Sequence, residues 1–434
     1  MRQMKLGLFL APGGHHMAAW RHPDAYPAGF SMQSYVAAAQ TAERGCFDML
    51  FVADVFSTTA SGDRQDSFRF EPLTLLSALA MTTRRIGLVA TATTSFNEPY
   101  NVARKFASLD HISNGRAGWN IVTSSSTLEA YNFGSADHRE LGERYRRADE
   151  FVEVVRGLWN SWDDGALLID KAGGRFFDAA KLRMLNHAGP EFSVRGPLSL
   201  PPCPQRHPVL VQAGSSEDGK TLASKYAEVI FTIQRDMAPA QAFYAEIKSR
   251  VAAFGRAPDH ALVLPGVLPV VGKTRQEARD KYEQLQALIH PEAGVAGLSR
   301  TLGIDLTGVD VDGPLPPVQI ETLSQSRAVG MVEAARRDNL SVRQVYERLL
   351  VSKGHRQLIG SVADVADSLQ EWFEASACDG FNIMPPLMPG GLIDFVELVV
   401  PELQRRGLFR RAYDGATLRD HLGLPRPGDL GAST

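Results

Sequence analysis

The chain has 434 residues, 44% of them hydrophobic, and 46 Lys and Arg against 49 Asp and Glu give a net charge of −3. This balance gives no electrostatic case for nucleic-acid binding, and no uncharged apolar run is long enough to span a bilayer. The three cysteines, Cys46, Cys203 and Cys378, are scattered without metal-ligand spacing. They argue against a disulfide framework and a zinc site. We therefore expect a cytoplasmic protein without a signal peptide, because the N-terminus leads directly into a strand-like run.

Short apolar runs alternate with helical patterns along most of the chain. Continuous apolar strands separated by helices are typical of a parallel sheet that helices cover on its outside. The predicted strands are 5–10, 49–53, 85–93, 117–122, 209–213, 229–233, 262–271 and 380–384. The main predicted helices are 34–44, 73–81, 101–112, 144–162, 241–254, 362–375 and 393–406, with another that ends at residue 227. Eight strands with intervening helices predict an α/β fold, the (β/α)₈ or TIM barrel.

Two segments interrupt this alternation of strands and helices. Residues 163–207 are punctuated by Gly and Pro and are interpreted as an excursion with one hairpin. Residues 274–360 hold two helical patterns, 274–289 and 341–352, with a loop rich in Gly, Pro and Asp between them. Long segments near a site are often lids or interface elements. We expect residues 1–434 to form a single barrel domain with these two insertions, the second being a lid over the substrate.

The strand at 209–213 runs into a turn that could bind an anion. Gly214 ends the strand, and Ser215 or Ser216 can cap the helix that follows. Such a turn leaves backbone N–H groups free at the positive end of the helix dipole, which favours a phosphate. An ordinary turn with a Ser cap and no ligand is the alternative, and the other strand ends decide between them.

In a barrel of this class the site is built from the C-terminal ends of the strands. Those ends carry mainly neutral hydrogen-bonding groups, and only His15 and His16 suit proton transfer near neutral pH. Paired carboxylates, metal-ligand spacing and a G-x-S-x-G motif are missing from the sequence, which disfavours glycoside cleavage, a metal centre and serine hydrolysis. Neutral donors beside a phosphate seat indicate a bound cofactor that does the chemistry. The candidate site residues at the other strand ends are Asp54, Thr91, Thr93, Asn120, Thr123, Ser124, Gly214, Ser215 and Ser216.

Short motifs throughout the chain carry a family resemblance. They include His-His-Met-Ala-Ala-Trp-Arg at 15–21 and Asn-Gly-Arg-Ala-Gly-Trp-Asn at 114–120. Others lie at 47–54, 91–100, 131–134, 143–145, 212–216, 379–382 and 401–407. In this order they resemble the bacterial-luciferase-like flavin monooxygenases, in particular the subgroup of nitrilotriacetate, dibenzothiophene-sulfone and long-chain alkane monooxygenases.

The resemblance implies that reduced FMN is the cofactor and that O₂ is the co-substrate. A separate NAD(P)H-dependent flavin reductase would supply the reduced FMN, and one oxygen atom would pass to a small organic substrate. A homodimer or homotetramer is implied as well. By motif, Asp54, Thr91 and Asn120 would lie along the isoalloxazine ring. Gly214, Ser215 and Ser216 would hold the phosphate, with Tyr145 reaching toward it.

The resemblance leaves the proton-transfer residue open among His15, His16 and His138. Leu141 stands four residues before Tyr145, where the subgroup often has a histidine. Leu141 could still contact the flavin through its backbone, while His138 could replace the missing imidazole. Two alternatives stay open: an F420-dependent oxidoreductase of the same fold, and a flavin-binding protein without turnover.

Overall fold

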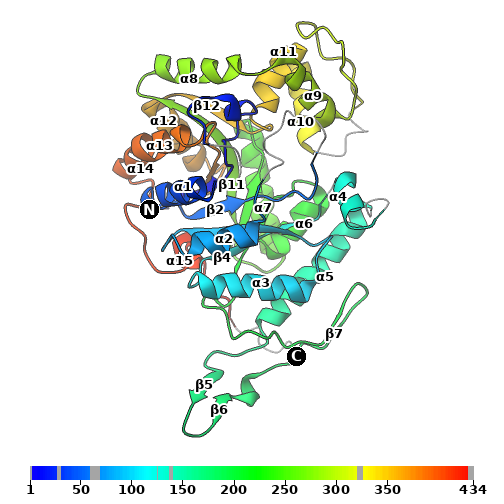
Figure 1. The fold of residues 1–434 in the computed structure, drawn as a ribbon, viewed down its shortest axis with the longest axis vertical. Coiled ribbons are helices and arrows are strands. Elements are labelled where there is room, and N and C mark those ends of the chain that lie inside the picture. The colour runs from blue at the N-terminus through cyan, green and yellow to red at the C-terminus, as the bar shows by residue number, and fades with distance from the viewer. Residues whose placement is uncertain are drawn as a thin grey trace.

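Eight parallel strands close into a barrel in the computed structural model, which describes residues 2–26, 31–58, 69–124, 126–135, 140–319 and 326–428 (Figure 1). The strands pair in the order β1, β2, β3, β4, β9, β10, β11 and β13, and β13 returns to β1. Their bounds are β1 Lys5–Phe9, β2 Met49–Val52, β3 Gly87–Thr93, β4 Ala117–Val122, β9 Val209–Gln212, β10 Val229–Thr232, β11 Leu262–Gly272 and β13 Gly380–Ile383. The predicted barrel is therefore confirmed, and all eight predicted strands belong to it.

Helices surround the barrel at the predicted positions. Their bounds are α1 Met32–Arg44, α2 Pro72–Ala80, α3 Pro99–Ile112, α5 Leu141–Trp159, α6 Glu217–Tyr226, α7 Met237–Ala253 and α12 Val362–Glu374. The predicted closing helix is α13 Gly390–Asp394 and α14 Val400–Arg405, joined by a π-helical turn. Pro72 and Pro99 start α2 and α3, where a missing N–H leaves no helical bond unmade. Among the described residues, none of the helices has the length and apolarity of a membrane span.

The segment 274–360 packs around an apolar cluster of its own, which includes Leu298, Val332 and Tyr346. It contains α8 Arg275–Ala287, α9 Pro291–Leu302, α10 Ser326–Arg337, α11 Val342–Val345 and β12 Arg356–Ser361. The sequence predicted the first and fourth of these but missed α9, α10 and β12. Strand β12 pairs with the second half of β11, outside the closed barrel. Gly294 of α9 lets the ring of Tyr346 approach, since a Cβ there would lie 2.7 Å from it.

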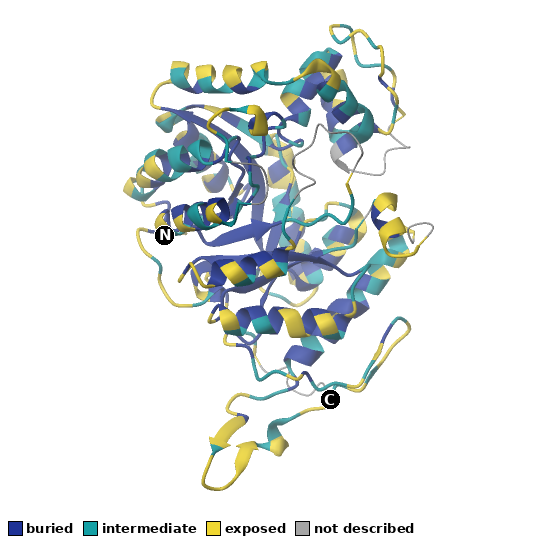
Figure 2. Cartoon of the chain, in the orientation of Figure 1, coloured by how far each residue is buried: buried dark blue, intermediate teal, exposed yellow. Residues whose placement is uncertain are grey.

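The segment 163–207 forms two hairpins, one more than predicted. The first joins β5 Leu167–Asp170 to β6 Arg175–Phe177, and the second joins β7 His187–Ala188 to β8 Ser193–Val194. Both project from the barrel, and the first is mostly exposed (Figures 1 and 2). Short strands interrupted by Gly and Pro give weak sequence patterns, which explains why the second hairpin was missed.

Candidate active site

The parallel barrel brings most of the predicted site residues to one end. His15 and His16 follow β1, Asp54 follows β2, and Gly214 follows β9. Because all strands run in the same direction, their C-terminal ends share this end of the barrel, which we call the mouth. In the described part of the chain, no group of His, Cys, Asp and Glu is placed to hold a metal ion.

Thr91 and Asn120 lie side by side inside the mouth. The register of β3 and β4 pairs them, and Asn120 Nδ2 donates to Thr91 Oγ1 at 2.8 Å. Both side chains are buried, and Asn120 Oδ1 has no hydrogen-bond partner among the described residues. A buried acceptor left unpaired costs about 1–3 kcal/mol. The pair therefore suits a ligand with an N–H group that points at Asn120.

Asp54 is a partly buried carboxyl group at the end of β2. Its Oδ1 accepts the N–H of Val55 at 2.9 Å. Burial raises the pKa of Asp54 to about 6, with a smaller upward contribution from the nearby Glu71 and Glu129 carboxylates and an opposing one from the Val55 N–H. Asp54 can therefore exchange a proton near neutral pH, a property that we had predicted only for histidines.

The β9–α6 turn lies beneath the hydroxyl of Tyr145. A Cβ on Gly214 would stand 3.0 Å from that oxygen and 2.3 Å from Gln212 Nε2. Gln212 Oε1 accepts the N–H of Gly214 at 2.8 Å, so Gln212 shapes the turn, a role that the sequence did not reveal. Ser216 caps α6 by accepting the N–H of Gly219 at 3.1 Å, and its Oγ donates to Tyr145 at 3.4 Å. Only glycine fits at position 214 without displacing these groups.

The amides of this turn are accessible. Ser215 is exposed and Ser216 is half-buried, so other protein segments do not cover the start of α6. No acceptor from the described residues contacts the N–H groups of Ser215 and Ser216. The turn keeps the donors that an anion at a helix N-terminus requires.

His15 has one nitrogen in use and one open. Its Nε2–H donates to the Phe9 carbonyl at 2.7 Å, and its ring lies 4.6 Å from the ring of Phe9. Nδ1 is buried and has no partner among the described residues. Burial, with Lys353 and His355 nearby, lowers the pKa of His15 well below its usual value. The neutral imidazole therefore offers Nδ1 as a hydrogen-bond acceptor that takes up a proton only transiently.

His16 uses both nitrogens inside the protein. Nδ1 accepts the N–H of Ala18 at 3.2 Å, and Nε2 donates to Gln286 Oε1 at 3.0 Å. This bond links the loop after β1 to α8, so His16 has a structural role whether or not it transfers protons. His138 lies outside the described residues, and Leu141 is the exposed first residue of α5, one turn before Tyr145. Their predicted roles stay predictions.

The stability of the protein should depend on pH through His16. Burial lowers the pKa of His16 to about 4, so the unfolded chain binds the proton first. The contribution of neutral His16 to the free energy of unfolding is present above pH 6.5. It is lost as the pH falls toward 4, and the loss is about 2 kcal/mol at pH 5. Urea unfolding at pH 7 and pH 5 should show a correspondingly smaller loss in His16→Gln. An equal loss in both proteins would contradict the shift.

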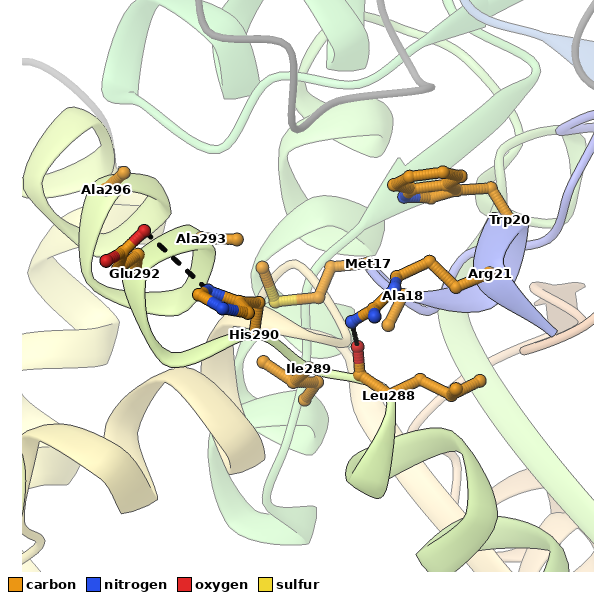
Figure 3. A pocket seen from close by; sticks show the side chains of 10 residues that line it. All are labelled: Met17, Ala18, Trp20, Arg21, Leu288, Ile289, His290, Glu292, Ala293 and Ala296. Atoms are coloured by element: carbon orange, nitrogen blue, oxygen red, sulfur yellow. Dashed lines mark hydrogen bonds and ion pairs between the residues drawn. The ribbon is translucent and has the colours of Figure 1, made fainter.

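A cavity of about 480 Å³ opens between the loop after β1 and the segment 288–296 (Figure 3). Its walls are mainly apolar, and Met17 and Ala18 place it directly after His16 in the chain. Arg21 donates to the carbonyl of Leu288 and presents a cation at the cavity. The exposed Trp20 lies on the same side. Glu292, 3.9 Å from His290, brings a carboxylate to the same cavity, so the cavity can admit a small organic molecule and contains charges of both signs.

Comparison with known proteins agrees with this geometry. The luciferase-like monooxygenase family model matches residues 4–377. N-acetyl-S-(2-succino)cysteine monooxygenase of Bacillus subtilis is 51% identical over 98% of both chains. Nitrilotriacetate monooxygenase component A of Aminobacter aminovorans is 50% identical over 98% of this chain and 97% of its own. The solved EDTA monooxygenase of Chelativorans sp. BNC1 superposes with a TM-score of 0.81 at 37% identity, covering 98% of this chain and 99% of its own.

These relatives are named monooxygenases, and the matching family model describes monooxygenases. The F420-dependent alternative is therefore less well supported. The predicted family resemblance is confirmed over nearly the whole chain. The chain belongs to the luciferase-like monooxygenase family and is a flavin-dependent monooxygenase of the two-component type.

Proposed function

We propose that the barrel mouth binds reduced FMN from a separate NAD(P)H-dependent flavin reductase and that one atom of O₂ passes to a small organic substrate. The observation that supports this best is the Gly214 turn under the Tyr145 hydroxyl, on the same end of the barrel as the Thr91–Asn120 pair. Bound reduced FMN would supply the electrons that O₂ activation requires.

The phosphate would bind at the start of α6. The amides of Ser215 and Ser216 and the hydroxyl of Tyr145 are the proposed donors, and the helix dipole favours the negative charge. Glu217 in the first turn would oppose an anion. However, its carboxylate is paired with Lys220 and lies 2.6 Å from Arg250, so most of its charge is balanced.

The ring system would lie over Asp54, Thr91 and Asn120. Asn120 Oδ1 would accept an N–H of the ring edge, which pairs the orphan acceptor. Asp54 and the open Nδ1 of His15 are the groups that can hold or accept a proton there. Phe9 and Phe51, with ring centroids 5.1 Å apart, form an apolar floor that excludes water.

The substrate class to test first is an organic anion. Nitrilotriacetate and N-acetyl-S-(2-succino)cysteine, which two relatives carry in their names, both bear carboxylates. Arg21 in the cavity beside His16 is a candidate partner for such a group. We further propose one domain with insertions at 163–207 and 274–360, the second covering the substrate. The pairing of β12 with β11 supports the single domain, and the cavity between the loop after β1 and residues 288–296 supports the cover. A cytoplasmic location is proposed because all three cysteines are free.

Gly214→Ala should weaken the binding of reduced FMN at least tenfold, about 1.4 kcal/mol. The added methyl group would displace Gln212 and Tyr145, which close the phosphate seat. Anaerobic titration with reduced FMN, followed by flavin fluorescence, measures the effect. Gly330→Ala is the matched control, because a Cβ there meets nothing within 4 Å.

Unchanged FMN affinity in Gly214→Ala would reject the proposed phosphate seat. Turnover is tested with a flavin reductase, ¹⁸O₂ and the two carboxylate substrates, and a product carrying one ¹⁸O atom is expected. A protein that binds reduced FMN yet oxidises none of a broad substrate panel would favour the flavin-binding alternative. Tighter binding of F420 than of FMN would favour the F420-dependent alternative.

A further inference from the structure

Helices α3 and α5 lie side by side next to the barrel (Figure 1), and a cavity of about 590 Å³ opens between their N-terminal halves. Its volume is typical of pockets that bind small molecules, which have about 300–1,000 Å³. On α5 the cavity is lined by Arg144 and Arg147, one turn apart, whereas Tyr145 between them faces Gly214. The cavity therefore lies on another side of α5 from the proposed phosphate seat and is separate from it.

Positive charge predominates around this cavity. Three cations line it together with one exposed carboxylate: Lys105, Arg144, Arg147 and Glu98. The Glu191 carboxylate, 3.7 Å from Arg147, balances one of the cations. Lys105 makes no hydrogen bond or ion pair with any residue that the structure describes. The cavity thus keeps positive charge that an anionic ligand can neutralise.

Arg144 has a nitrogen without a partner. Its Nη1 donates to the Ser124 carbonyl, but its Nε is buried and has no hydrogen-bond partner among the described residues. Burial lowers the pKa of Arg144, because the charged guanidinium loses contact with water. A buried cationic donor that is left unpaired is costly, and an anion beside Arg144 would offset this cost.

The N-terminus of α3 adds backbone donors at the same place. Glu98 is the N-cap residue but makes no side-chain capping bond, and Pro99 at the first position has no N–H. No acceptor from the described part of the chain contacts the N–H groups of Tyr100 and Asn101. Asn101 lines the cavity, so the positive end of the helix dipole lies beside it. The helix end and the cations therefore favour the same kind of ligand.

One wall of the cavity is aromatic. Phe96 follows β3, and Phe133 follows the short helix α4 Thr127–Asn132. Their rings are stacked, with centroids 4.4 Å apart and planes 4° from parallel. Phe133 is nevertheless 45% exposed, so a further ring can pack against it. Inorganic phosphate would fill only a small part of this cavity, whereas a phosphate attached to an aromatic ring would use both the cations and the phenylalanines.

We propose that this cavity is a second ligand site and that it binds a mononucleotide, which is a phosphate monoester joined to an aromatic ring system. The phosphate lies against Lys105, Arg144 and the Asn101 N–H, where its charge of about −1.5 to −2 meets the surplus of cations. The ring packs on Phe133. This site goes beyond the proposed function and does not depend on flavin binding at the barrel mouth. AMP and FMN both have the required chemistry, and binding measurements distinguish them.

The test is calorimetric titration of the flavin-free, full-length protein with AMP and with inorganic phosphate. One AMP per chain should bind, at least about tenfold more tightly than phosphate, because only AMP can stack on Phe133. Lys105→Gln should weaken AMP binding at least about fivefold, because the ion pair with the phosphate is lost. Phe133→Ala should weaken AMP binding to a similar extent and leave the affinity for inorganic phosphate unchanged.

Arg104→Gln and Tyr131→Ala are the matched controls, because both side chains are exposed neighbours that do not line the cavity. They should bind AMP like wild type. Gly214→Ala should do so as well, because it alters only the phosphate seat of the mouth. Thermal unfolding verifies that all variants fold.

Titration with oxidised FMN identifies the kind of mononucleotide. A second FMN per chain that Lys105→Gln loses and Gly214→Ala keeps assigns a flavin to the cavity. AMP binding without a second FMN assigns an adenine nucleotide.

The proposal is overturned if wild type binds neither AMP nor a second FMN. It is also overturned if Lys105→Gln and Arg104→Gln bind AMP equally well, or if only Gly214→Ala weakens AMP binding, which would place AMP at the mouth. Inorganic phosphate that binds as tightly as AMP would show that the phenylalanines contribute nothing, and it would overturn a mononucleotide as the occupant.

Discussion

His15→Phe is expected to lower the turnover of substrate oxygenation at least a hundredfold while reduced FMN still binds within about threefold of wild type. The substitution keeps the ring contact with Phe9 but removes Nδ1, the open acceptor at the mouth. Loss of a positioned general acid or base costs about 10²–10⁴ in rate. Steady-state turnover with a saturating supply of reduced FMN measures the loss, and an anaerobic titration measures flavin binding.

The comparison variant is His16→Gln, because His16 has both nitrogens bonded within the protein. We expect it to lose turnover less than tenfold. If His15→Phe keeps turnover within threefold, proton transfer belongs to another group. Asp54 is then the candidate. A pH–rate profile with a transition near pH 6 that is absent in Asp54→Asn would identify it.

The barrel was predictable because each strand is a continuous apolar run between polar or glycine-rich segments. Strand β11, Leu262–Gly272, is buried along its whole length, because its first half lies in the barrel wall and its second half pairs with β12. The site end followed from the same pattern, since parallel strands place residues such as Thr91 and Asn120 at one end. Periodicity therefore predicted the architecture and the location of the site.

Features that depend on contacts between distant segments were not predictable. His16 binds Gln286, 270 residues away, and the pKa of Asp54 depends on burial by segments that fold around it. Helix α9 contains Gly294 and Gly297, which weaken the helical pattern. These glycines are needed in the folded protein because the side chains of Tyr346 and Leu350 pack directly against them.

Strand β12 was missed for a related reason. Its sequence, Arg356–Ser361, mixes polar and apolar residues because it pairs only with β11, at the edge of the sheet. An edge strand needs no continuous apolar run, so its pattern did not separate it from the surrounding excursion. The predicted insertion at 274–360 consequently included a strand that hydrogen-bonds to the barrel wall.

Arg410→Met should lower the free energy of unfolding by about 3–5 kcal/mol, the largest stability effect that we expect. Asp48 is fully buried just before β2, where its Oδ2 accepts the N–H of Leu6 at 2.7 Å and its Oδ1 contacts Arg410. Arg410 also donates to the His421 carbonyl at 2.6 Å. Burial raises the pKa of Asp48, while Arg410 and Lys5 lower it. Without Arg410 the carboxylate is left in the interior with less compensating charge.

Removing both charges should cost less than removing one, which distinguishes this pair from a simple loss of packing. In Arg410→Met with Asp48→Asn the buried anion is gone, and part of the lost stability should return. Arg405→Met breaks the ion pair between the exposed Arg405 and Glu402 and should leave the free energy of unfolding nearly unchanged. Urea unfolding of all three variants measures these differences. A loss below 1 kcal/mol for Arg410→Met would mean that water or Lys5 already compensates Asp48. Asp48 precedes β2 at the end of the barrel opposite the mouth, so the folded fraction of each variant should keep its affinity for reduced FMN.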